Sequence, residues 1–185
     1  MKKIEVEFRA LLTKESYISL TKTLEKQAND LGEDDKDVYF FFPEGKILKA
    51  VHNVSRKTGK IVLKLSRIGR GSAFEEIEIP ISAADVERAA SMFRALGVPE
   101  GFHSFQKRRN FSYKGVEIAV KYSDVWGYHA ELEIMIDALG EQPAAEQKIR
   151  AVAGELGLEL MSEEELRTFI ARAEKKNYKR GLAEK

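Results

Sequence analysis

The stretch Ile-Glu-Val-Glu-Phe-Arg at residues 4–9 alternates strictly between apolar and charged side chains. Successive side chains of a β-strand point to opposite faces of the sheet, so this alternation predicts a strand over residues 3–12. One face of that strand would be apolar, and the other would carry Glu5, Glu7 and Arg9. The fold depends on whether such charged faces point to solvent or to an enclosed interior.

The rest of the chain contains seven further strand-like runs and four helical segments. The strands are expected at residues 37–42, 46–52, 60–68, 74–81, 102–113, 115–123 and 128–137. The helices are expected at residues 14–30 and 83–96, from Pro143 to Gly157, and from Ser162 onwards. The polar residues 29–36 and 53–60 are expected to be loops. Strands that come in runs favour an antiparallel α+β fold of eight strands, with about four helices outside the sheet.

The charges segregate by strand. Acidic residues occur as Glu-x-Glu pairs at positions 5/7, 76/78 and 131/133. Cations occupy the charged faces of other strands, at Lys49, Lys64, Lys107 with Arg109, and Lys121. For any single strand, a half-buried sheet with a solvated face is the simpler interpretation. A face selected only for solubility would mix its charges along each strand, so the segregation favours a closed barrel with a charged interior.

Enclosed charges of this kind have a chemical use. Neighbouring carboxylates need a cation or a proton when they are enclosed, and carboxylate oxygens suit hard divalent cations such as Mg²⁺ or Mn²⁺. Converging Lys and Arg side chains suit an anion with several charges. Mg²⁺ commonly shares its coordination between carboxylates and phosphate oxygens, so the pattern predicts a site for a metal ion and a phosphate chain.

Several motifs resemble those of one protein family, in the same order along the chain. They are Glu5-Val-Glu7-Phe-Arg9, Asp37-Val-Tyr-Phe, Ile47-Leu48-Lys49, Leu63-Lys64, Phe74-Glu75-Glu76-Ile77-Glu78, Lys107-Arg108-Arg109 and Gly127-Tyr-His-Ala-Glu131-Leu-Glu133. Each motif alone is common on strands. The ordered set resembles a divergent member of the CYTH proteins, or triphosphate tunnel metalloenzymes, on the branch of class IV adenylyl cyclases and thiamine triphosphatases.

The resemblance implies a single domain over residues 1–185, built as an eight-stranded antiparallel tunnel that binds a triphosphate with Mg²⁺ or Mn²⁺. Family activities include inorganic triphosphatase, thiamine triphosphatase, RNA 5′-triphosphatase and adenylyl cyclase. The implied metal ligands are Glu5, Glu7, Glu131 and Glu133, with Glu76 and Glu78 as second candidates. The implied phosphate-binding residues are Arg9, Lys49, Lys64, Lys107, Arg109 and Lys121. The implied catalytic residues are Glu5, Glu7 and Arg9.

Three positions depart from the family pattern. Arg9 stands where the family has a Lys, which keeps the charge but replaces a compact ammonium by a planar guanidinium. The strand that reads Leu48-Lys49-Ala50-Val51 has one cation where the family has two. Lys121 lies near the position of an acidic residue in the family, and Asp124 is the nearest acid. If that acid shapes a second metal site, turnover is expected to suffer.

Composition excludes several other classes. With 31 Lys and Arg against 30 Asp and Glu, the net charge of +1 gives no general affinity for nucleic acids or membrane surfaces. The absence of Cys excludes disulfides, thiol catalysis and Cys-based zinc sites. No apolar run could span a bilayer, and the N-terminus has no signal-peptide core. A cytoplasmic protein with a small-molecule triphosphate substrate is expected, and a homodimer stays open.

The leading functional hypothesis is metal-dependent hydrolysis of a triphosphate, which can be inorganic, thiamine or nucleoside triphosphate. The first alternative is an adenylyl cyclase, supported mainly by the Asp37-Val-Tyr-Phe segment. The second is a polyphosphate- or nucleotide-binding protein that lost turnover with the changes at Val51 and Lys121. Charge alone recognises the triphosphate, so all three substrates stay open.

Overall fold

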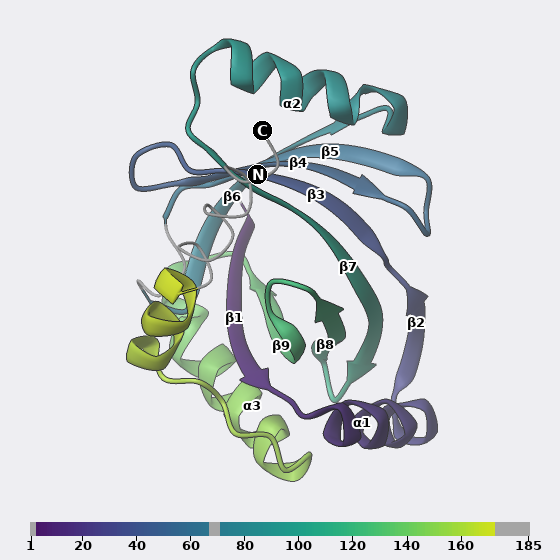
Figure 1. Cartoon of the computed structure of the whole chain (residues 1–185). Coiled ribbons are helices and arrows are strands. Elements are labelled where there is room, and N and C mark those ends of the chain that lie inside the picture. Colours follow the sequence, from purple (N-terminus) through teal and green to yellow (C-terminus); the bar gives the residue numbers. More distant parts are fainter. Residues whose placement is uncertain (1–2, 67–70, 173–185) are drawn as a thin grey trace.

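A computed structural model describes residues 3–66 and 71–172 of the chain, with only the backbone of Lys3. In this part, antiparallel strands surround a central space and helices lie outside them (Figure 1). The strands are β1 (Lys3–Leu11), β2 (Asn29–Glu33), β3 (Lys36–Phe41), β4 (Ile47–Asn53), β5 (Thr58–Lys64), β6 (Ala73–Ile81), β7 (Glu100–Tyr113), β8 (Val116–Ser123) and β9 (Gly127–Ile136). The helices are α1 (Lys14–Gln27), α2 (Val86–Ala95), α3 (Gln142–Glu155) and a last helix at residues 163–172, with short 3₁₀ turns at Ala83–Asp85 and Leu139–Glu141.

Eight of these strands close into a barrel. Their order is β7-β3-β4-β5-β6-β1-β9-β8, and β8 pairs with β7 to complete the ring. All neighbouring strands in the ring are antiparallel. The predicted α+β class and the eight-stranded antiparallel barrel are therefore confirmed. Closure also removes the exposed edges that an open sheet of this size would present.

Strand β2 is additional, and it lies where a loop was expected at residues 29–36. Strand β7 has 14 residues, so one of its edges pairs with β3 along residues 100–106 and with β2 along residues 109–112. β2 thus prolongs β3, and α1 ends at Gln27 rather than at residue 30. The sequence of β2, Asn-Asp-Leu-Gly-Glu, has no apolar alternation and is mostly exposed, so periodicity gave no strand signal.

Local sequence signals begin the helices. The hydroxyl oxygen of Thr13 accepts a hydrogen bond from the backbone N–H of Ser16 at 3.1 Å, which caps α1. Pro143 lies in the first turn of α3, as expected. Ser162 and Glu165 cap the last helix reciprocally, each side chain accepting a hydrogen bond from the other residue's backbone N–H. Within the described residues, no helix combines the length and apolarity needed to cross a membrane.

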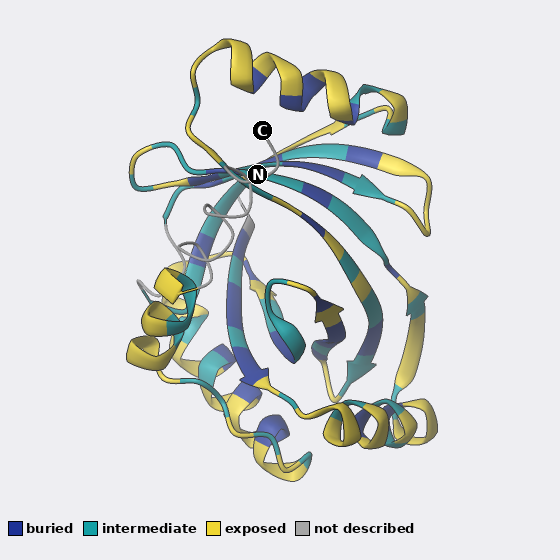
Figure 2. Ribbon diagram, viewed as in Figure 1, coloured by how far each residue is buried: buried dark blue, intermediate teal, exposed yellow. Residues whose placement is uncertain are grey.

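The helices bury the outer face of the barrel (Figure 2). Leu24 of α1 and Ile149 of α3 belong to one buried cluster with Leu132 of β9. Across the barrel, Phe93 of α2 packs edge-on against Phe41 of β3, with ring centroids 5.4 Å apart. Because these apolar side chains face the helices, the side chains that alternate with them on the strands, the charged ones among them, face inward.

The inward faces of the strands enclose a cavity of about 510 Å³, called the tunnel below. The charged residues that line it are Glu5, Glu7, Arg9, Lys36, Lys49, Lys60, Lys64, Glu76, Glu78, Arg108, Lys121, Glu131 and Glu133. The prediction of a charged interior is confirmed, and a solvated outer face is the wrong interpretation for the three Glu-x-Glu pairs.

Gly59 on β5 lies directly beneath the turn that leads into α2. A Cβ at this position would lie 2.7 Å from the backbone oxygen of Ser82 and 2.8 Å from Cγ2 of Val86. Gly59→Ala is therefore expected to lower the free energy of unfolding by about 1–3 kcal/mol, measured by urea unfolding. Gly140→Ala is the control, because a Cβ there has no neighbour within 4 Å. Equal stability of the two variants would contradict this packing.

Candidate functional site

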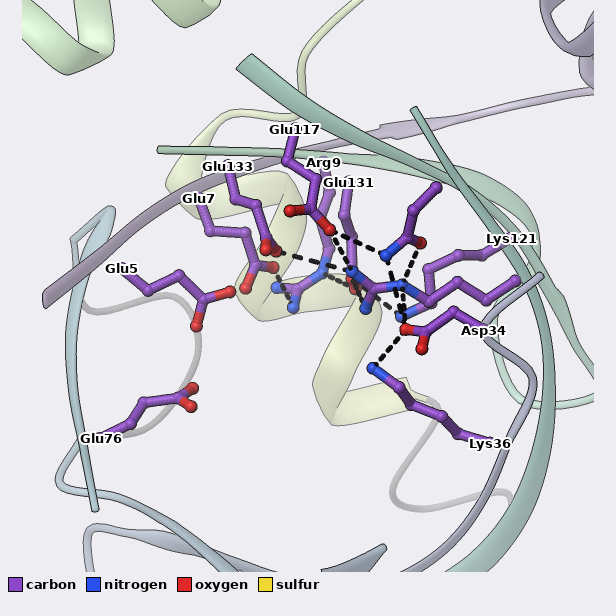
Figure 3. A network of polar contacts seen from close by, with 12 residues as sticks. Glu5, Glu7, Arg9, Asp34, Lys36, Glu76, Glu117, Lys121, Glu131 and Glu133 are labelled. Atoms are coloured by element: carbon purple, nitrogen blue, oxygen red, sulfur yellow. Dashed lines mark hydrogen bonds and ion pairs between the residues drawn. The ribbon is translucent and has the colours of Figure 1, made fainter. Parts of the chain in front are cut away.

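Acidic side chains lie next to one another on one wall of the tunnel. The strand register places Glu7 of β1 opposite Glu133 of β9, and Glu133 opposite Glu117 of β8. We call Glu5, Glu7 and Glu133, which line the tunnel, the acidic row (Figure 3). Glu117 lies beside Glu133 but does not line the tunnel. Like charges opposite each other destabilise a sheet. Burial and the neighbouring Glu5 raise the pKa of Glu133 to about 8, and burial also raises the pKa of Glu7. Glu133 therefore keeps a proton near neutral pH unless a cation replaces it.

Two cations neutralise part of this charge. Nζ of Lys64 lies 3.0 Å from Oε2 of Glu5 and 3.3 Å from Oε2 of Glu7. Arg9 forms an ion pair with Glu7 and donates a hydrogen bond from Nε to Oε1 of Glu131 at 3.0 Å. Burial alone would lower the pKa of each cation, but the surrounding carboxylates raise it. Lys64 and Arg9 are therefore charged throughout the physiological range.

Three cations surround Glu131. Nζ of Lys121 donates a hydrogen bond to it at 2.8 Å, and Nη1 of Arg108 lies 3.7 Å from it, in addition to the bond from Arg9. Burial alone would raise the pKa of Glu131, but Lys121 and Arg9 hold it well below its usual range. A carboxylate held in this way would have to leave these partners to ligate a metal ion. Glu133 is better placed for that role, because burial and Glu5 disfavour its free charged form.

A second group of polar side chains is centred on Asp34, between β2 and β3. Asp34 is only 4% exposed. It accepts a hydrogen bond from Nδ2 of Asn53 at 2.6 Å, and it lies 2.8 Å from Nζ of Lys36. Nε of Arg108 lies 3.4 Å away. Burial alone would raise the pKa of Asp34, but Lys36 lowers it. Asp34 thus holds two tunnel cations, Lys36 and Arg108, in place.

The structure corrects the expected placement of Lys107 and Arg109. Both lie on the outer face of β7, and neither lines the tunnel. Arg109 instead forms ion pairs with Asp30 of β2 and Glu25 of α1. The physical reason is the parity of the strand, because Phe111 shares their face and is fully buried in the outer core. These two residues are therefore not positioned to bind a phosphate in the tunnel.

Arg108, Lys36 and Asp34 are the site residues that sequence reasoning missed. Arg108 stands between two outward cations, and the parity of Phe111 was the signal that would have placed it inside. Lys36 and Asp34 fall in a segment that was expected to be a loop. Lys36 continues the alternation of β3, whereas Asp34 lies between two strands and has no periodic signal.

The other ten predicted site residues line the tunnel, and their roles stay predictions. Oε1 of Glu76 lies 2.7 Å from Nζ of Lys64. Burial alone would raise the pKa of Glu76, but Lys64 and Lys49 lower it to about 2. Glu78 is about half exposed and forms an ion pair with Lys60. Glu76 therefore belongs to the buried charge network, whereas Glu78 lies nearer to solvent.

Lys49 differs from the other tunnel cations. Within the described residues its Nζ has no hydrogen bond or ion pair, whereas the other six cations that line the tunnel each contact a carboxylate. Burial and the nearby charge of Lys64 lower the pKa of Lys49 to about 8. A bound anion would supply the missing partner and would raise this pKa. Lys49 is therefore the tunnel cation that an anion can approach without breaking an existing ion pair.

Trp126 joins the tunnel wall to the last helix. Its ring centroid lies 4.6 Å from that of Phe169 and 5.3 Å from that of His129, and Cζ of Arg9 lies 5.0 Å from it. Figure 3 shows the helix behind Arg9. Burial and the neighbouring Lys121 lower the pKa of His129 to about 4, so this ring is neutral at pH 7. Trp126 therefore lines the tunnel while its ring packs among Arg9, His129 and Phe169.

The acidic row fits a hard divalent cation in its chemistry. Oε1 of Glu7 and Oε1 of Glu76 are buried and accept no well-formed hydrogen bond, although cations lie near them. Within residues 3–66 and 71–172, no three acidic or His side chains already surround one point. Arg9 and Lys64 lie between the carboxylates instead. A metal ion bound by the acidic row would therefore displace these two cations and the proton of Glu133.

The sequence and the barrel match one family. The model of the CYTH domain family matches residues 3–166. The chain therefore belongs to the CYTH domain family. Among curated proteins the sequence has no match.

The fold is shared with solved structures. A conserved hypothetical protein from Pyrococcus furiosus is 26% identical, with a TM-score of 0.70 over 88% of this chain and 94% of that chain. A candidate adenylate cyclase from Vibrio parahaemolyticus is 18% identical, with a TM-score of 0.66 over 92% and 99%. A candidate adenylyl cyclase from Hippeastrum with a dominant triphosphatase activity is 15% identical, with a TM-score of 0.60 over 86% and 90%. At these identities, the last two show a common fold alone.

The raised pKa of Glu133 predicts how stability depends on pH. Its pKa is 4.5 in the unfolded chain and about 8 in the folded protein. Between these values the folded protein holds a proton that the unfolded chain has released, so the free energy of unfolding falls as pH rises. Glu133→Gln removes this loss. In chelator-treated protein, urea unfolding is expected to show the variant gaining stability over the wild type from pH 5 to pH 8. A constant difference across that range would contradict the prediction.

Proposed function

We propose that this protein is a metal-dependent hydrolase that cleaves a triphosphate inside the tunnel. The observation that carries the proposal is that carboxylates and cations line the same cavity. The carboxylates form the acidic row, and the cations include Lys49. Membership of the CYTH family supports it, as does the triphosphatase activity attributed to the Hippeastrum protein of the same fold.

Glu5, Glu7 and Glu133 would hold Mg²⁺ or Mn²⁺, with Glu131, Glu76 and Glu78 as further candidates. Such an ion supplies positive charge against the phosphate oxygens as negative charge develops on them. Glu5 and Glu7 would then exchange their ion pairs with Lys64 and Arg9 for the metal. After this exchange Arg9 would keep its bond to Glu131 and Lys64 its contact with Glu76, and each cation would have one side open to the substrate.

The cations would bind and orient the phosphate chain. Lys49 offers an ammonium that forms no ion pair with any residue of 3–66 or 71–172, and Lys64 and Arg9 are fixed by burial on the neighbouring walls. Preorganised cations of this kind stabilise the charge that develops in phosphoryl transfer. Water would attack the terminal phosphorus in line. The new P–O bond would form as the bridging P–O bond breaks, and the proton of water would pass to a carboxylate of the acidic row.

An adenylyl cyclase is the alternative that the Asp37-Val-Tyr-Phe segment suggested. In the structure, Oδ1 of Asp37 lies 2.5 Å from Nε2 of His103, and Tyr39 stacks on the same ring with centroids 4.3 Å apart. Neither side chain lines the tunnel, whereas Phe40 does. This segment therefore supports the fold more than a cyclase reaction. Cyclic AMP and pyrophosphate as products from ATP would favour the cyclase over the hydrolase.

Replacement of the central carboxylates tests the proposal. Glu5→Gln and Glu7→Gln are expected to abolish Mg²⁺- or Mn²⁺-dependent release of orthophosphate from tripolyphosphate, ATP and thiamine triphosphate, because each loses a charged oxygen donor. Glu25→Gln on α1 is the control, since its partner Arg109 lies outside the tunnel. Undiminished turnover in both tunnel variants would contradict the assignment. Binding of a triphosphate without any product in the wild type would indicate a binding protein.

Two lysines give a matched test of the phosphate-binding wall. Lys49→Gln is expected to raise KM for the triphosphate at least about tenfold, or ~1.4 kcal/mol, because it removes from the tunnel an ammonium that no described residue pairs. Lys107→Gln removes the same charge from the outer face and is expected to leave KM within twofold. Steady-state kinetics at fixed metal concentration measures both. A similar effect of the two variants would indicate long-range charge rather than contact with Lys49.

A further inference from the structure

The tunnel has an apolar wall as well as a charged one. Strands β3, β4 and β5 contribute apolar side chains to the lining, namely Val38, Phe40, Ile47, Val51 and Val62. The strand register makes them contiguous: Val38 lies opposite Val51, and Lys49 lies between Phe40 on one side and Val62 on the other. The carboxylates of the acidic row belong to β1 and β9 instead. The two walls therefore differ in chemistry.

This apolar wall is separate from the outer core. Val38, Val51 and Val62 form their own buried cluster with Phe40 packed against it, distinct from the two clusters beneath the helices. An inorganic triphosphate is charged along its whole length, so contact with cations favours its binding and contact with valines does not. A ligand with both a phosphate chain and an apolar part would gain binding free energy from both walls, because burial of apolar surface is favourable.

Phe40 is the part of this wall that a ligand can reach. Its ring is partly exposed, whereas the three valines are almost fully buried. Phe102 supports it from the side, with ring centroids 4.6 Å apart. Cross-strand neighbours of a sheet have Cβ atoms about 5 Å apart, so the ring lies beside Lys49. The ammonium of Lys49 forms no ion pair within the part of the chain that the structure describes. One ligand can therefore place an aromatic group on Phe40 and a phosphate on Lys49.

We propose that the substrate is an organic ester of triphosphate that carries an aromatic ring, and that Phe40 is a specificity-determining residue that packs against this ring. Inorganic triphosphate is then the poorer substrate. The cavity of about 510 Å³ is within the size range of sites that enclose organic ligands. This inference rests on the proposed hydrolase function and selects among its substrates.

The experiment compares tripolyphosphate with two aromatic esters, ATP and thiamine triphosphate, at saturating Mg²⁺ and at saturating Mn²⁺. In the wild type, kcat/KM is expected to be at least tenfold higher for one ester than for tripolyphosphate. Phe40→Ala is expected to lower the value for that ester roughly 5- to 100-fold, as for loss of a base–aromatic stack. Its value for tripolyphosphate is expected to stay within twofold, and Phe40→Leu to lie between the wild type and Phe40→Ala.

Phe105→Ala is the matched control, because Phe105 is 48% exposed and does not line the tunnel. This variant is expected to leave all three substrates unchanged. Circular dichroism and thermal unfolding check that each variant folds. If Phe40→Ala does not fold, Val51→Lys tests the same wall by adding a cation two residues from Lys49. It is expected to shift selectivity towards tripolyphosphate.

The outcomes separate the inference from the function on which it rests. If tripolyphosphate is the best substrate of the wild type, or if Phe40→Ala lowers all substrates equally, the apolar wall only fills space and the inference is overturned. Unchanged selectivity in Val51→Lys would also overturn it. If none of the three compounds is hydrolysed with either metal, the proposed function itself fails. Hydrolysis of an ester with selective loss in Phe40→Ala supports both.

Discussion

The structure depends on the electrostatic balance of carboxylates enclosed on one wall of a barrel. Glu7 and Glu133 lie opposite each other on β1 and β9, an arrangement that costs free energy unless positive charge is close. Lys64 and Arg9 supply that charge from the inside of the same barrel. The carboxylates of the tunnel are thus largely neutralised by its own cations. Removal of one partner of such a buried ion pair is destabilising, because it leaves the other charge buried and unpaired.

This balance requires that every strand keep its register. A slip of one residue on β1 would turn Glu5, Glu7 and Arg9 into the apolar layer beneath α3 and would expose their apolar neighbours to the tunnel. Ring closure through β7 and β8 and the buried outer clusters oppose such a slip. Burial of the apolar outer side chains therefore fixes the register that keeps the charged side chains inside, because both sets alternate along the same strands.

Alternation was enough to predict the barrel and most of its site. Residues 4–9 combine strict period two with charge on one face, and the other Glu-x-Glu strands repeat the pattern. The argument failed on β7, where three consecutive cations allow either parity and Phe111 decides between them. It also failed on β2 and Asp34, because pairing with the far end of a long strand is a tertiary effect without a local period. The roles of the tunnel residues depend on a bound ligand, which alternation alone does not specify.

The position of Trp126 has a spectroscopic consequence. It is the only Trp of the chain, and it lies between Phe169 and the guanidinium of Arg9. Indole emission depends on nearby charge and on packing, so a shift of Arg9 from Glu7 towards another partner would change the light that the protein emits. The molecule thus contains a single built-in fluorophore at the tunnel wall, and no label is needed to follow events there.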